Sequence, residues 1–134
     1  MSLEIINPEP LGPPSGYSNG ILVDVHGKLL FIAGQIAWDK EHNLVGETFV
    51  EQFDKALENV MTVLKYAGGF PRHVVRLAIY VRDKDEYLDQ QEEIGEVYRK
   101  HMGKHFPAMV LVEVNRLVDG EAQVEIEGTA LISG

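Results

Sequence analysis

The chain has 134 residues and contains no cysteine, so disulfide bonds, thiolate metal sites and a cysteine nucleophile are excluded. It also has no apolar run of about 18 residues, the length that a transmembrane helix needs, and we expect no membrane partner. Residues 1–16 have neither a basic region nor an apolar core of the kind found in signal peptides. These absences fit a cytoplasmic location.

Basic residues are scarce as well. The 12 Lys and Arg residues stand against 21 Asp and Glu residues, which gives a formal net charge of −9. The basic residues are scattered, whereas nucleic-acid binding needs clustered Lys and Arg, so we expect no nucleic-acid partner. A negative protein also repels anionic ligands at long range. An anionic substrate would therefore need a dedicated local cation.

The remaining composition is that of an ordinary globular protein, with 45% hydrophobic and 25% charged residues. A chain of this length is sufficient for one hydrophobic core. We find no internal repeat, low-complexity tract or linker in the sequence. We therefore expect a single domain over residues 1–134.

Apolar periodicity and turn residues predict the secondary structure. Thr48 and Glu51 have the spacing of a capping box, and apolar residues then recur every three or four positions as far as Ala67, which predicts a helix. A second helix is expected from about Asp85 to His101. The proline-rich residues 1–19 are expected to form an extended arm. The expected strands cover residues 20–25, 28–33, 74–81, 108–114 and 122–132, with a tight turn at His26-Gly27 between the first two.

This order of elements predicts an α+β sandwich, in which one sheet carries both helices on one face. Several strands are nevertheless apolar on both faces, as in the alternation of Leu30 and Ile32 with Leu29 and Phe31. A sheet that is apolar on both faces must be covered on both. Because no helix is left for the second face, we expect a homo-oligomer to bury it.

Carboxylates occur inside the apolar strands near the C-terminus. Alternation places Met109, Leu111 and Glu113 on one face of their strand and three valines on the other, and we expect the valine face to pack on the helices. By the same logic Glu125 and Glu127 point away from the helices. Carboxylates at an apolar subunit boundary would have raised pKa values, which suits general acid–base catalysis. The alternative is that they lie on a wet sheet edge or pair with arginines.

Other candidate sites are weaker. His101 and His105 have the i, i+4 spacing of metal ligands, but Gly103 ends the helix between them and no third ligand is evident, so we expect no metal. No hydrolase elbow or phosphate-binding glycine loop is present, and no cofactor is expected. Tyr17 follows a Gly- and Pro-rich segment, where it is either a mobile lid aromatic or a packed residue of the arm.

Four segments together resemble the Rid family of reactive-intermediate (enamine/imine) deaminases, also called the YjgF or L-PSP family. The similarity covers nearly the full length. The segments are Tyr17-Ser18-Asn19-Gly20; Phe31-Ile32-Ala33-Gly34-Gln35; Ala56-Leu57-Glu58-Asn59-Val60 with Ala67-Gly68-Gly69; and Pro107-Ala108 with Val112-Glu113-Val114, Arg116-Leu117 and Val124-Glu125-Ile126.

The resemblance implies a chorismate-mutase-like α+β sandwich with a mixed sheet, assembled as a homotrimer. In that assembly the sheets line a central barrel, and small-molecule ligands bind in clefts between subunits. The resemblance also implies that Glu125 is catalytic and positions the attacking water. The substrate-binding residues that it implies are Tyr17, Ala33, Gly34, Met109 and Leu111, with Gln91 nearest to an asparagine that is frequent in the family.

The sequence departs from the family at Met109. In the family's deaminases an arginine directly after Pro-Ala binds the carboxylate of a 2-imino or 2-enamino acid, and methionine offers no such donors. Arg76 or Arg116 could in principle reach the cleft, but Arg116 already matches a different arginine of the family signature and is not reassigned. We therefore predict hydrolysis of an imine, an enamine or a related C–N bond in a substrate without a carboxylate at that position. The alternatives are a non-catalytic ligand-binding trimer and an interaction or chaperone-like protein.

Overall fold

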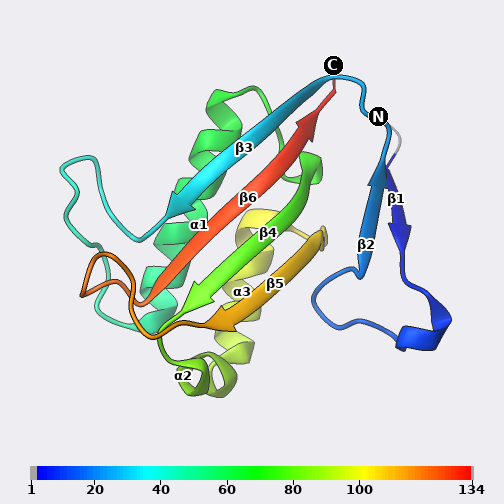
Figure 1. Ribbon diagram of the computed structural model, residues 1–134. Helices are drawn as coiled ribbons and strands as arrows, with labels where there is room; N and C mark the ends of the chain where they lie inside the picture. The colour runs from blue at the N-terminus through cyan, green and yellow to red at the C-terminus, as the bar shows by residue number, and fades with distance from the viewer. Residues whose placement is uncertain (1–2, 134) are drawn as a thin grey trace.

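The computed structural model describes residues 3–133 as a four-stranded mixed sheet with helices on one face and a separate N-terminal hairpin (Figure 1). The strand order is β3-β6-β4-β5, in which β6 runs antiparallel to both neighbours and β4 runs parallel to β5. The sheet strands are β3 (Lys28–Gln35), β4 (Val74–Val81), β5 (Ala108–Glu113) and β6 (Val124–Ile132), and the helices are α1 (Phe49–Tyr66), α2 (Lys84–Asp89) and α3 (Gln91–Met102). The α+β class and the placement of the helices are confirmed.

Helix α1 begins at the predicted capping box. The Thr48 side chain accepts a hydrogen bond from the Glu51 backbone N–H at 3.2 Å, and the Glu51 carboxylate accepts one from the Thr48 N–H at 3.0 Å. Both bonds satisfy backbone donors that the first helical turn leaves free. The apolar stripe that follows is buried against the sheet and forms most of the helical half of the core: Phe49, Phe53, Ala56, Leu57, Val60 and Leu64.

The second predicted helix is two helices, which corrects the expectation of two helices in all. Gln90 has φ −119° and ψ 26°, outside the helical range, and separates α2 from α3. Asp83 caps α2 by accepting hydrogen bonds from the backbone of Asp85 and Glu86. No glycine or proline marks the break in the sequence. Among residues 3–133, none of the helices has the length and apolar character needed to cross a bilayer.

The predicted hairpin around His26-Gly27 is wrong. Strand β2 (Gly20–Val23) pairs with β1 (Leu3–Ile6), while β3 pairs with β6. Gly27 has φ +118°, and a Cβ at this position would overlap the backbone carbonyl of Ile132. The glycine is therefore required because the chain passes close to the end of β6, and not because it forms a tight turn.

The predicted orientation of β5 is also wrong. Residues paired across neighbouring strands share a face of the sheet. Met109 pairs with Leu77 and Leu111 pairs with Ile79, and both partners are buried beneath the helices. Met109 and Leu111 therefore face the helices, and the valines of β5 face the open side. The alternation could not decide this, because both faces of β5 are apolar.

The carboxylates divide between the two faces. Glu113 pairs with the buried Val81, and its carboxylate accepts a hydrogen bond from the backbone N–H of Lys84 at the start of α2, at 3.0 Å. Glu113 therefore does not point to the open face, contrary to the prediction. Glu125 pairs with Tyr80 on the open face, and its neighbours Val124 and Ile126 are fully buried on the helix side, as predicted.

Candidate functional site

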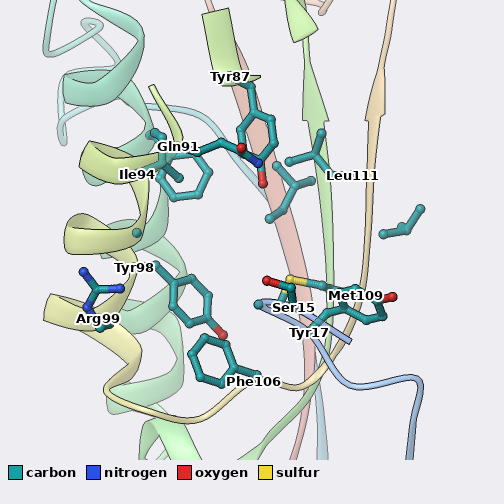
Figure 2. Close-up of a pocket in the computed structure, with 15 residues that line it drawn as sticks. Ser15, Tyr17, Tyr87, Gln91, Ile94, Tyr98, Arg99, Phe106, Met109 and Leu111 are labelled. Atoms are coloured by element: carbon teal, nitrogen blue, oxygen red, sulfur yellow. The ribbon is translucent and has the colours of Figure 1, made fainter. Parts of the chain in front are cut away.

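A cavity of about 720 Å³ lies between α3 and β5 (Figure 2). Gln91 and Ile94 from α3 form one wall, and Met109 and Leu111 from β5 form the facing wall. Tyr17 approaches from the N-terminal segment. The cavity is therefore mainly apolar, with polar groups placed along its α3 side, which is the usual character of a small-molecule site.

An aromatic pair lines one end of the cavity. The rings of Tyr98 and Phe106 stack with their centroids 5.4 Å apart and an interplanar angle of 7°. The Tyr98 hydroxyl donates a hydrogen bond to the backbone oxygen of His105 at 2.7 Å. Burial raises the pKa of the Tyr98 phenol, so this side chain stays neutral. Tyr98 is thus a fixed wall and not an acid–base group.

The N-terminal segment is held against the start of β5 by Ser18. Its backbone N–H donates to the Pro107 oxygen at 3.2 Å, and its hydroxyl donates to the Phe106 oxygen at 2.6 Å. Ser18 is buried, whereas the adjacent Tyr17 is 39% exposed at the cavity. The position of Tyr17 therefore follows from two hydrogen bonds made by its neighbour.

A second group of candidate residues lies on the open face of the sheet. Glu125 is half-buried there, and a Cβ built on Gly34 would overlap its Oε2 atom. The missing side chain of Gly34 therefore makes room for the Glu125 carboxylate. Nearby, the Tyr80 hydroxyl donates a hydrogen bond to Glu127 at 2.5 Å, and this bond raises the pKa of Tyr80.

The family model described as Endoribonuclease L-PSP matches residues 8–132 of the chain. The chain belongs to this family, the Rid family. A RutC family protein of Pyrococcus abyssi is 35% identical over 124 residues, which cover 92% of this chain and 89% of that protein. The human 2-iminobutanoate/2-iminopropanoate deaminase is 30% identical over 125 residues, with 92% and 83% covered.

Solved structures show the same fold. The Rid family protein YyfB from Yersinia pestis, described as of unknown function, superposes with a TM-score of 0.86. It is 34% identical and the match covers 98% of this chain and 100% of that one. The YjgF gene product from E. coli superposes with a TM-score of 0.70 at 26% identity, with 95% and 94% covered. The Rid fold therefore extends over the whole described chain.

The structure divides the site residues expected from the Rid resemblance into two groups. Tyr17, Gln91, Met109 and Leu111 line the cavity on the helix side. Glu125 and Gly34, together with Ala33 in the same strand, do not line it. Within one chain the sheet separates the proposed catalytic carboxylate from the cavity.

One cation of the cavity was missed from the sequence. Arg99 of α3 lines it, whereas Arg76 and Arg116 do not. Arg99 directly follows the buried Tyr98, and a search for the apolar stripe of the helix does not select it because it is charged. The available signal was the spacing of four that joins Gln91, Gly95 and Arg99, which places them along one side of the helix.

The histidines considered as metal ligands make other contacts. His101 Nε2 lies 2.6 Å from an Asp54 carboxylate oxygen, and His105 Nε2 donates to the Val74 carbonyl oxygen at 2.6 Å. Partial burial alone would raise the pKa of Asp54, but hydrogen bonds from Lys100 and His101 outweigh burial and lower it. Residues 3–133 contain no group of three or more His, Cys, Asp or Glu side chains arranged to hold a metal ion.

Proposed function

We propose that this Rid family member hydrolyses an imine, an enamine or a related C–N bond, and that the cavity between α3 and β5 binds the substrate. The mammalian relatives named 2-iminobutanoate/2-iminopropanoate deaminase, at 30% and 31% identity, support this reaction class. The observation that carries the proposal is the position of Met109 on the cavity wall. A thioether there favours an apolar group and provides no donor for a carboxylate.

The substrate that fits this wall has no carboxylate next to the reacting carbon. Leaving one member of a buried charge pair without its partner costs about 2–5 kcal/mol. Because the chain carries a net charge of −9, its general field does not compensate for the missing cation. Short 2-imino acids are therefore poor substrates in this proposal.

In the proposed reaction Glu125 acts as the general base. Its carboxylate accepts a proton from a water molecule while the water oxygen attacks the carbon of the protonated imine. The resulting carbinolamine collapses to a carbonyl compound and ammonia, so one imine and one water yield one carbonyl and one ammonia. This role requires Glu125 and the substrate to lie in one cleft.

We propose that a homotrimer supplies that cleft between subunits. The cavity of one copy would then receive the Glu125 carboxylate of a neighbouring copy, which accounts for their separation within one chain. Apolar side chains left uncovered on the sheet support an assembly: Leu29 is 52% exposed and Phe31 is 73% exposed. A surface of this kind on a small protein usually marks an interface.

The N-terminal hairpin gives independent support for an assembly. Strands β1 and β2 pair with each other, and Ser18 provides the bridge that ties the segment to β5. Leu22 in β2 is 60% exposed, and Val25, just after β2, is 77% exposed. At the opposite side of the sheet, β3 is an edge strand. An exposed apolar arm and an open sheet edge both favour contact with further copies of the chain.

The direct test is hydrolysis of a neutral imine. A flavin-dependent amine oxidase acting on benzylamine releases benzaldimine, and added semicarbazide competes with water for this imine. The benzaldehyde released by hydrolysis forms the same semicarbazone more slowly, so the assay follows the initial rate of semicarbazone formation. The wild-type protein is expected to lower this initial rate, and Glu125→Gln is expected to slow hydrolysis by about 100-fold or more. Wild-type protein that leaves the initial rate unchanged would point to the non-catalytic or chaperone-like alternatives.

A second variant tests the position of Glu125 without changing its chemistry. The methyl group of Gly34→Ala would overlap the Glu125 carboxylate and displace it. A displacement of about 1 Å is expected to lower kcat for benzaldimine by up to about 100-fold. Gly120→Ala is the matched control, because a Cβ at Gly120 meets no atom within 4 Å. Equal activity of the two variants would argue against a catalytic role for Glu125.

A further inference from the structure

A polar stripe follows one side of α3 at the cavity. Gln91, Gly95 and Arg99 are spaced by four residues, so they lie one above another on the helix, and all three line the cavity. Figure 2 shows Gln91 and Arg99 on this helix. The neighbouring stripe of Ile94 and Tyr98 is buried in the core. The cavity therefore has an apolar interior and a polar border on α3.

Gly95 makes room for the Arg99 guanidinium. A Cβ on Gly95 would lie 3.2 Å from Arg99 Nη1 and 3.9 Å from Cζ. The guanidinium is therefore folded back along the helix toward Gly95, beside the cavity. Glycine is the least favourable residue of a helix interior after proline. Its presence in the middle of α3 fits the space that this guanidinium occupies.

Arg99 is exposed and has no charged partner within ion-pair distance among the described residues. Among residues 3–133 its guanidinium makes no hydrogen bond or ion pair. The adjacent Lys100 and His101 are both bound to Asp54, at 2.6 Å each. In a chain of net charge −9, Arg99 is thus a local cation at the candidate site.

We propose that Arg99 binds a carboxylate at the end of the substrate remote from the reacting carbon. This inference rests on the proposed function and narrows its substrate class to imines or enamines with an apolar or aromatic body and a distant carboxylate. Arg99 lies on the α3 wall and Met109 on the facing β5 wall, so the charge is recognised on the opposite side of the cavity from Met109 (Figure 2). The planar guanidinium offers paired donors to both carboxylate oxygens.

The test uses two unreactive probes that differ in charge. Calorimetry compares 3-phenylpropionate with 3-phenylpropionamide on the wild-type protein and on Arg99→Ala. The wild-type protein is expected to prefer the carboxylate by about tenfold. Arg99→Ala is expected to lose this preference while its affinity for the amide is unchanged, and Arg99→Lys is expected to retain part of it.

Arg72→Ala is the control for net charge. Arg72 is exposed outside the cavity, where it packs on the Phe70 ring at 4.8 Å, and its replacement should leave the preference intact. The inference would be overturned if the wild-type protein bound the two probes with equal affinity or did not bind the carboxylate. It would also be overturned if Arg72→Ala lost the preference for the carboxylate as fully as Arg99→Ala. Because neither probe has a C=N bond and benzaldimine has no carboxylate, this failure is distinct from failure of the proposed hydrolysis.

Discussion

Replacing Met109 with arginine is expected to raise kcat/KM for 2-iminopropanoate by roughly 100- to 1,000-fold. Met109 is half-buried on the β5 wall, and the cavity of about 720 Å³ has space for the longer side chain. The new guanidinium would bind the carboxylate next to the reacting carbon. The assay generates the imine with an amino-acid oxidase acting on alanine and traps the remainder with semicarbazide.

Two further variants show whether the gain arises in the cleft. Leu88→Arg adds the same charge at a residue of α2 that is 52% exposed and does not line the cavity, and it should give no gain. Adding Glu125→Ala to Met109→Arg should remove the gain, because the attacking water loses its base. A folded Met109→Arg protein without improved activity would show that more than this one residue separates the site from 2-imino acids.

Phe31→Asp is expected to dissociate the proposed homotrimer. Phe31 lies on the edge strand β3 with 73% of its surface exposed, beside the exposed Leu29. If neighbouring copies cover this surface, the variant buries a carboxylate without a partner, which costs at least several kcal/mol. Light scattering should then report a shift from three chains of 15.0 kDa each to one. Benzaldimine hydrolysis should also fall on dissociation, because in the proposed trimer each cleft is formed by two neighbouring subunits.

Tyr66→Asp is the matched control for dissociation. Tyr66 ends α1 and is 86% exposed, on the helical layer and away from the open face of the sheet. The same change there should leave the assembly intact. A wild-type mass of 15.0 kDa, or a Phe31→Asp protein that keeps the wild-type mass, would contradict the proposed trimer.

Much of the fold could be predicted because its signals are local. The capping box at Thr48 and Glu51 and the apolar repeat that follows specify α1 without reference to the rest of the chain. The break at Gln90 has no comparable signal, because no glycine or proline stands there. Gly27 does give a turn signal, but its positive φ serves the approach to Ile132, which is more than 100 residues away in the sequence.

The candidate site, too, could be predicted only where the sequence carries a local signal. Periodicity could not orient β5, because Met109 and Val110 are both apolar and only their pairing with β4 decides which side is buried. The family resemblance identified Tyr17, Gln91 and Met109, which the structure brings to one cavity. Arg99 lies outside the quoted family segments and beside an apolar stripe, so its spacing of four from Gln91 and Gly95 was its one signal in the sequence. Its position follows from the fold of α3 over β5.

In the proposed function, Met109 removes 2-imino acids from the substrates of this Rid family member. The most direct measurement is the wild-type rate of 2-iminopropanoate hydrolysis, assayed beside the human 2-iminobutanoate/2-iminopropanoate deaminase, to which the chain is 30% identical. We predict a kcat/KM at least about 100-fold below that of the human enzyme. A value comparable with that of the human enzyme would contradict this role of Met109.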